Sequence, residues 1–182
     1  MNTSRSLNVQ QLIRACACTE QVEKFKAFFR EQVLVTEELA VQYAQEFDFD
    51  FGAQHLLSAW GFKVYKEAEA SAERMYRETI APALKVYDET IAPAGKAYRE
   101  AEAAAWKVYE ETTASAGRFK VYNKATASAG RVYDKAEAAA GGVYREATAP
   151  AGKAYREATA PAWKVYREAT AKAFARQYIK EQ

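Results

Sequence analysis

Apolar and polar residues alternate with a period of eleven through most of the chain. Tyrosines recur at this spacing from Tyr65 to Tyr166, except for one interval of thirteen between Tyr109 and Tyr122. On a helical wheel at ~100° per residue, the tyrosine of each repeat lies at 0°, and the residues at the fourth, eighth and eleventh positions lie between about −20° and −80°. Arg, Glu and Lys at the second, third and tenth positions lie on the opposite side, at about 100° to 200°. The pattern therefore predicts a long amphipathic helix with one narrow apolar stripe.

The predicted stripe contains tyrosines at the first position of the repeat and valines at the eleventh. Eleven residues over three turns favour a right-handed supercoil, so we expect the stripe to mediate self-association through a coiled coil. Its residues are Tyr65, Tyr76, Tyr87, Tyr98, Tyr109, Tyr122, Tyr133, Tyr144, Tyr155, Tyr166, Val86, Val108, Val121, Val132, Val143 and Val165.

The interval of thirteen residues breaks the phase of the stripe, because two extra residues rotate it by ~200°. The break falls at Gly117, Arg118, Phe119 and Lys120, with five repeats on each side. Two outcomes are open: a hairpin that turns near residues 117–120, or one continuous helix whose halves face different neighbours. We favour the continuous helix in an oligomer, because the text around Gly117 resembles that around Gly130 and Gly152.

Prolines interrupt the repeat at one fixed position. Pro82, Pro93, Pro150 and Pro161 each remove a helical hydrogen bond, at a cost of about 3 kcal/mol. Because all four occupy the same repeat position, we expect them to bend the helix in one direction without breaking it.

The first 57 residues have a different pattern, typical of three or four short helices. Asn8 followed by Gln11 predicts a capped helix that runs to about Cys16. We expect Thr19 to cap a second helix, and Thr36 to cap a third whose apolar face includes Leu39, Tyr43 and Phe47.

Two segments connect these predicted helices. Residues 33–35 form a β-branched run that predicts either a connector or one brief strand. Residues 47–52 alternate Phe and Asp and predict an extended turn, with Asp50 as the cap of a fourth short helix through His55. The division that we expect is a helical head at 1–57, the repeat at 58–176 and a polar tail at 177–182.

Charge and composition exclude several classes of protein. The net charge is +2, and residues 1–57 carry five Lys/Arg against eight Asp/Glu, which leaves 21 against 16 for the remainder. A basic stripe is lacking, so we expect no nucleic-acid partner. The sequence shows no signal peptide and no run of ~18 apolar residues that could span a bilayer. These features predict a cytoplasmic protein.

The residues with catalytic or metal-binding chemistry are few. Cys16, Cys18 and His55 do not supply a tetrahedral ligand set, so we interpret the cysteines as small buried residues and His55 as a packing or capping residue. Asp48 and Asp50 are better explained by a turn than by a calcium site. Trp60, Trp106 and Trp163 lie near the edge of the stripe and are expected to pack on a partner helix. The sequence predicts no catalytic residue, cofactor or metal, and no enzyme.

The repeat text YREATAPAWKVYREATA resembles that of the hendecad-repeat coiled-coil proteins of bacteria and phages. The head text at residues 17–25, 35–39, 49–52 and 56–58 is similar to the small domain that often precedes such repeats. The resemblance covers most of the chain and implies an all-α architecture, but it implies no activity and no site residues.

The sequence thus predicts an all-α, self-assembling structural protein that forms a homo-oligomer through the repeat helix and acts as a scaffold or oligomerisation module. An alternative is a peripheral protein that lies on lipid surfaces, since proline-punctuated eleven-residue repeats also resemble exchangeable apolipoproteins and synucleins. The alanine-rich stripe, which is poor in Leu and Phe, argues against this alternative.

Overall fold

A computed structural model describes residues 4–116 and 122–181, and the chain in it is mostly α-helical. It divides into two compact units. The first, which we call the head unit, contains Met1–Ile80 and Thr159–Gln182. The second, which we call the arm unit, contains Ala81–Ala158. The all-α prediction is confirmed.

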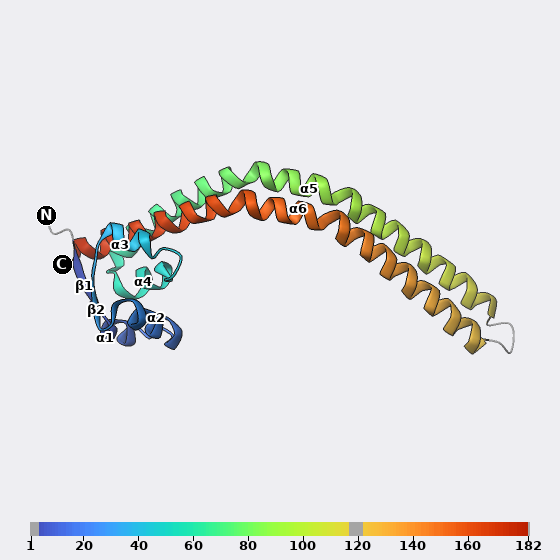
Figure 1. The fold of residues 1–182 in the computed structure, drawn as a ribbon, viewed down its shortest axis with the longest axis horizontal. Coiled ribbons are helices and arrows are strands. Elements are labelled where there is room, and N and C mark those ends of the chain that lie inside the picture. Colours follow the sequence, from blue (N-terminus) through green and yellow to red (C-terminus); the bar gives the residue numbers. More distant parts are fainter. Residues whose placement is uncertain (1–3, 117–121, 182) are drawn as a thin grey trace. The chain divides into compact units, whose positions relative to one another are not determined.

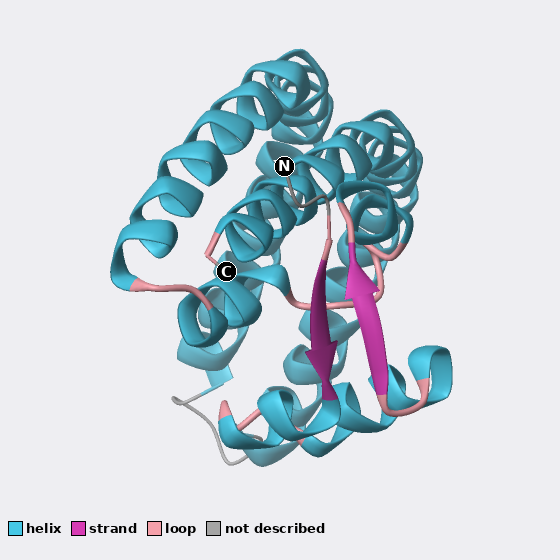
Figure 2. Cartoon of the chain, turned by 90° about the vertical axis from the view of Figure 1, so that its left-hand side faces the viewer, coloured by secondary structure: helices cyan, strands magenta, loops and turns pink. Residues whose placement is uncertain are grey.

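The head unit begins with four short helices and a small sheet. The helices are α1 (Val9–Arg14), α2 (Thr19–Phe29), α3 (Glu37–Gln42) and α4 (Phe49–Leu56). Strands β1 (Arg5–Asn8) and β2 (Gln32–Val35) pair antiparallel, with Ser6 opposite Leu34 (Figure 2). The strand interpretation of residues 33–35 is therefore confirmed. Its partner β1 was missed because RSLN has neither a β-branched residue nor an alternating pattern.

Side-chain caps fix where the head helices begin. Asn8 and Gln11 form the predicted capping box, and the Thr36 hydroxyl accepts from the Leu39 amide as predicted. Two cap predictions are wrong. The cap of α4 is Asp48, whose carboxylate accepts from the Phe51 amide, so Asp50 lies inside the helix. Helix α2 already includes Thr19.

Two long helices contain the repeat: α5 (Ala59–Ala116) and α6 (Tyr122–Lys180). In each unit the α5 segment lies beside the α6 segment and runs antiparallel to it (Figure 1). In the arm unit, Tyr87 contacts Tyr155 and Tyr98 contacts Tyr144, so the α6 partner number falls as the α5 number rises. The hairpin is thus confirmed, and our preference for one continuous helix is wrong. The predicted phase break, Gly117 to Lys120, lies outside the described residues.

Both helices continue through their prolines. Pro82 and Pro93 lie inside α5, and residues 150 and 161 are helical in α6. A proline at the seventh repeat position removes the donor to the carbonyl four residues earlier, at the third position. Those third-position residues, among them Glu89 and Glu157, are exposed, so water can hydrate the unpaired carbonyl. Hydration explains how the helix tolerates the proline.

The core of the head unit includes the end of α6. Ala171, Phe174, Ala175 and Tyr178 are buried in one cluster with Tyr65 and with residues of the short helices, such as Phe25. The Tyr178 hydroxyl donates to the Ser6 carbonyl at 2.9 Å, and the Arg5 guanidinium lies 4.2 Å from the centre of the Tyr178 ring. The segment that we predicted as a polar tail, 177–182, is therefore helical to Lys180 and contributes to the core.

Candidate functional site

The tyrosines of the repeat pair across the two long helices. The ring centroids lie 5.3 Å apart in Tyr87–Tyr155, 6.0 Å in Tyr98–Tyr144 and 6.3 Å in Tyr109–Tyr133 within the arm unit, and 5.9 Å in Tyr76–Tyr166 within the head unit. Aromatic pairs at such distances are stabilising beyond the area that they bury. The repeated tyrosine therefore sets the register of the hairpin.

Ninth-position residues of the repeat lie beside tyrosines of the opposite helix. A Cβ added at Gly95 would lie 3.8 Å from the Tyr144 ring, and one at Gly152 would lie 3.9 Å from the Tyr87 ring. Where the ninth residue is Trp106, the indole instead contacts Tyr133 edge to face, with centroids 5.8 Å apart. Small and large residues at one position thus accommodate the same opposite ring.

The interface is centred differently from the predicted stripe. Tyrosines and eighth-position alanines face the partner helix, as predicted. The other residues in the interface are those of the fifth position, such as Ile91 and Thr159, and not those of the fourth and eleventh positions. The fifth position lies at about +40° on the wheel, so the stripe is rotated by about 50°. Val121 lies outside the described residues, and for Tyr122 only its place at the start of α6 is described.

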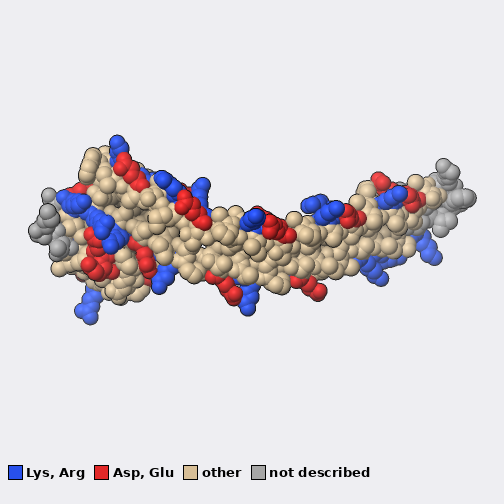
Figure 3. Space-filling model, turned by 90° about the horizontal axis from the view of Figure 1, so that it is seen from above, with Lys and Arg blue, Asp and Glu red and all other residues tan. Residues whose placement is uncertain are grey.

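The eleventh-position valines that we assigned to the stripe are exposed. In the arm unit Val86 is 63% exposed, Val108 51%, Val132 54% and Val143 65%, and Val165 in the head unit is also exposed. We call the four arm-unit residues, Val86, Val108, Val132 and Val143, the valine row. Along the extended part of the surface in Figure 3, charged side chains lie mainly near the edges, with uncharged surface between them. The hairpin interface leaves the valine row available to another partner.

The head unit contains an apolar cleft with a volume of about 90 Å³. Large side chains from several elements converge on it and remain half-buried, among them Leu12, Phe29, Val33, Leu39, Tyr43 and Phe47. Asp48 and Gln21 are polar residues at its lining. This cleft is the second place where the chain leaves large apolar side chains incompletely covered.

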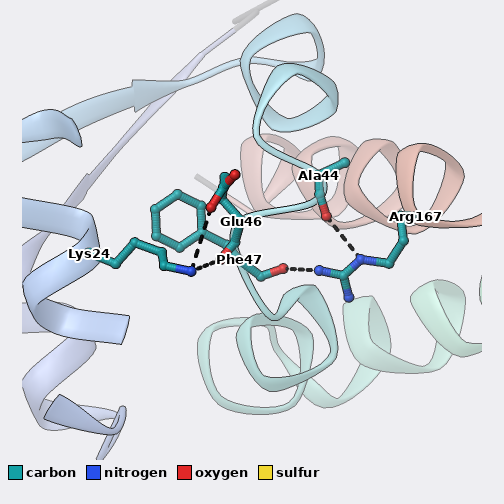
Figure 4. Close-up of polar contacts among 5 residues, drawn as sticks. All are labelled: Lys24, Ala44, Glu46, Phe47 and Arg167. Atoms are coloured by element: carbon teal, nitrogen blue, oxygen red, sulfur yellow. Dashed lines mark hydrogen bonds and ion pairs between the residues drawn. The ribbon is translucent and has the colours of Figure 1, made fainter. Parts of the chain in front are cut away.

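Two cationic side chains, Arg167 and Lys24, bind the segment between α3 and α4, which lines one side of this cleft (Figure 4). The Arg167 guanidinium donates from Nε to the Ala44 carbonyl at 3.0 Å and from Nη2 to the Phe47 carbonyl at 2.6 Å. Lys24 donates to the Glu46 carbonyl at 3.3 Å and pairs with the Glu46 carboxylate at 3.5 Å. Because Tyr43 and Phe47 belong to this segment, these contacts fix the shape of the cleft.

Two tyrosine hydroxyls of the head unit contact carboxylates. Tyr65 is fully buried and donates to Asp50 at 2.9 Å; burial, then the Asp50 hydrogen bond, raise the pKa of Tyr65 far above its usual value. Tyr166 donates to Glu69 at 3.5 Å, and burial together with the charges of Glu69 and Asp50 raises the pKa of Tyr166 to about 12. Both phenols therefore remain protonated at neutral pH and act as donors.

The candidate cysteines and histidine lie apart from these surfaces. Cys16 and Cys18 are free and exposed, so the prediction that they are buried is wrong. Cys16 has a φ of 61° in the turn that follows α1. His55 lies in the last turn of α4 with its ring 4.4 Å from the Phe51 ring, which confirms a packing role.

The tryptophans pack as predicted where they face a partner helix. Trp163 stacks on Tyr166 and contacts Tyr76 across the hairpin at 5.8 Å, much as Trp106 contacts Tyr133. Trp60 is 68% exposed. Packing therefore explains two of the three tryptophans.

Sequence reasoning missed Arg167 and Tyr178. Arg167 occupies the second repeat position, where Arg145 and Arg156 also stand, so its role in the head has no local signal. The eleven-residue spacing would place the next tyrosine at position 177, but Gln177 stands there and the tyrosine follows at Tyr178. That shift of one residue is a signal that could have indicated a change of partner.

Residues 4–116 and 122–181 contain no group of three or more His, Cys, Asp or Glu side chains arranged to hold a metal ion. Over the same residues, none of the helices is both long and apolar enough to cross a membrane.

A scan of protein-family models found no match to the chain, and searches of curated proteins and of solved structures found no similar protein.

Proposed function

We propose that the protein is a self-assembling structural protein that associates through the exposed valine row of its arm unit and has no catalytic activity. The observation that carries this proposal is the exposure of Val86, Val108, Val132 and Val143, each by more than half, at one position of the repeat. The tyrosines already have partners inside the hairpin, so the valine row is the part of the repeat that a second chain can cover.

The expected gain is substantial because the row is repeated. Full burial of a valine contributes roughly 1.5–3 kcal/mol, so covering a side chain that is half exposed contributes about 1 kcal/mol. Four such residues on one copy together contribute about 4 kcal/mol, toward the roughly 8 kcal/mol of a micromolar association and before the cost of immobilisation.

The test replaces the row by alanine in the full chain, as Val86→Ala, Val108→Ala, Val132→Ala and Val143→Ala together. Alanine already stands at the eleventh position at Ala97 and Ala154, so the hairpin is expected to keep its helicity. Sedimentation equilibrium at micromolar concentration should show an oligomer for the natural chain and a monomer for the variant. A natural chain that stays monomeric would contradict the proposal.

A matched control removes exposed charges and leaves the row intact. Lys96→Ala with Lys153→Ala breaks two weak surface pairs, with Glu100 at 3.7 Å and Glu157 at 3.8 Å. Such pairs contribute little, so this variant should sediment as the natural chain does.

The alternative of peripheral lipid binding has one supporting observation, the exposure of Trp60, since tryptophan favours a membrane interface. Its support is weaker, because the amphipathic helices already cover their tyrosine faces with each other. Flotation with anionic vesicles separates the two functions: lipid-bound monomer supports the alternative, and lipid-independent oligomer supports assembly.

A further inference from the structure

The head-unit cleft has the size of one aliphatic side chain. Its volume of about 90 Å³ is smaller than the roughly 150 Å³ of an engineered apolar cavity that holds benzene. It is also far below the roughly 300 Å³ at which sites for larger small molecules begin. The lining is nearly all apolar, with half-buried Leu12, Val33 and Leu39 at its surface. A single Val, Leu or Met side chain of a partner therefore fits it best.

One lining residue of this cleft, and two residues next to the lining in sequence, are carboxylates without a counter-ion in the described part of the chain. Asp48 belongs to the lining, Glu20 precedes Gln21 of the lining, and Glu38 precedes Leu39. Among the residues that the structure describes, these three carboxylates form no ion pair, whereas Glu23, Glu37 and Glu46 pair with Lys or Arg. The complementary partner carries positive charge beside its aliphatic side chain.

One segment of the arm unit has this composition. In five repeats of the described residues the tenth-position lysine pairs with a glutamate four residues later, as Lys107 does with Glu111. After Arg131 the residue four places on is Lys135, so the pair is replaced by two like charges that repel each other. Val132, 54% exposed, lies between them, and Lys124 precedes them on the same helix.

We propose that the head-unit cleft of one copy binds the segment around Val132 of a second copy, so that chains join head to arm. This inference rests on the proposed self-association and names the surface that covers part of the valine row. Val132 enters the cleft, and Arg131 and Lys135 lie opposite Glu20, Glu38 and Asp48. Glu20, Glu38 and Asp48 attract Arg131 and Lys135, and two copies of either set of side chains repel each other.

Such a contact joins two different surfaces of the same chain. A heterologous contact of this kind leaves one free head and one free arm on every dimer, so it propagates to larger assemblies unless it closes into a ring. A row-to-row contact of two arms would instead stop at the dimer. The size of the oligomer therefore reports on the mode of assembly.

The test is a charge swap in the full chain. The head variant is Glu20→Lys with Glu38→Lys, and the arm variant is Arg131→Glu with Lys135→Glu; all four side chains are exposed, so circular dichroism should match the natural chain. Each variant alone should weaken self-association by about tenfold or more, because like charges then meet at the contact. A chain with all four substitutions should regain the natural association.

The outcomes distinguish the two proposals. If the four-alanine valine-row variant is monomeric but the head variant associates as the natural chain does, the head-to-arm inference is overturned and self-assembly stands. If neither change alters the sedimentation of the natural chain, both proposals fail. Failure of the four-fold charge swap to restore association also overturns the inference.

The exposed cysteines of the head provide a measurement that needs no change in the cleft. Cys16 and Cys18 flank Ala17, which lines the cleft. With Ser128→Cys, one helical turn before Val132, a short thiol cross-linker should join residue 128 of one copy to Cys16 or Cys18 of another. Ala103→Cys, exposed on the other helix of the arm unit, is the control and should give none of this cross-link. Equal yields from both variants would contradict the inference.

Discussion

Arg167 shows how one residue of a repetitive helix acquires a specific structural role. Its equivalents Arg145 and Arg156 extend from the same repeat position in the arm unit, yet Arg167 donates to two backbone carbonyls of the segment between α3 and α4. A guanidinium presents several donors in a fixed plane, so a single side chain can satisfy both carbonyls. The repeat sequence around Arg167 is like that of the other repeats. The contact is therefore specific because the segment between α3 and α4 lies opposite this one arginine.

We therefore predict that Arg167→Ala lowers the free energy of unfolding by about 1.5–3 kcal/mol, the range for hydrogen bonds to charged groups. Urea denaturation followed by circular dichroism measures the change. Arg145→Ala, at the same repeat position and exposed, is the control and should stay within about 0.5 kcal/mol of the natural chain. Equal effects of the two substitutions would show that the head contact contributes nothing.

The half-buried phenol of Tyr166 leads to a second prediction, about alkaline pH. Its pKa is raised from 10.0 to about 12, so between these values the folded chain keeps a proton that the unfolded chain has lost. The stabilising contribution is complete below pH 10 and is lost as the pH rises through 12. Absorbance titration of phenolate should show a component near pH 12 that Tyr166→Phe removes. If the substitution leaves the late component unchanged, the assignment to Tyr166 is wrong.

Local chemistry explains which residue-level predictions succeed. Asn8 and Thr36 accept from amides three residues away, so sequence alone identifies them as caps. Asp48 and Asp50 both satisfy the same local rule, and only the position of Phe51 in the folded helix selects Asp48. Tyr178 and Arg167 contact residues more than a hundred positions away, and no local pattern specifies such partners.

At the scale of elements, the two helices of the arm unit are held in register by aromatic pairs. A double-mutant cycle on Tyr98→Ala and Tyr144→Ala should give a coupling of about 0.5–1.5 kcal/mol, the value of an aromatic pair beyond its area burial. Urea denaturation of the four chains measures it.

The control cycle combines Tyr98→Ala with Tyr155→Ala, which pairs with Tyr87 one repeat away. Because these two residues do not face each other, their effects should add within about 0.5 kcal/mol. A coupling as large as that of Tyr98 and Tyr144 would contradict the observed register.

The wheel predicted the period of these helices but not the centre of their interface. Valine at the eleventh position is more apolar than threonine at the fifth, so hydrophobicity alone places the stripe around the valines. The paired helices instead bury the face that carries the tyrosines, the eighth-position alanines and the fifth-position residues, and ninth-position residues such as Gly95 lie beside the opposite ring. The direction of the chain after residue 116 has no signal in a periodic pattern, since the two halves read alike.

At the scale of the whole molecule, the compact units do not follow the order of the sequence, since residues 81–158 separate the two segments of the head unit. The head unit combines residues near both ends, because Phe174 and Tyr178 of α6 pack in one core with Val9 and Phe25. A short N-terminal domain buries too little surface to be stable by itself, and the end of the repeat helix supplies the missing apolar side chains. Composition alone made residues 177–182 look like a solvated tail.

We therefore predict that a chain ending at Arg176 loses the fold of its head unit. Removing a fully buried aromatic side chain such as that of Tyr178 costs about 3–5 kcal/mol, a large part of the stability of a small domain. Loss of amide dispersion for residues 5–56 in NMR spectra measures it. Tyr178→Phe keeps the ring and should cost only about 1 kcal/mol, for the hydrogen bond to Ser6. A well-dispersed head in the truncated chain would refute the prediction.

The antiparallel pairing of near-identical repeats also constrains how such a gene can change length. Gain of one repeat in α5 alone would leave a tyrosine of the arm unit without its opposite ring and shift every later pair. Gain of one repeat in each helix would keep every tyrosine opposite a tyrosine, as in the pairs Tyr87–Tyr155 and Tyr98–Tyr144. Both helices would then be longer by about 16 Å. Recombination between the repeats is therefore expected to survive selection as matched events, one in each half of the coding sequence, so that variants differ by two repeats at a time.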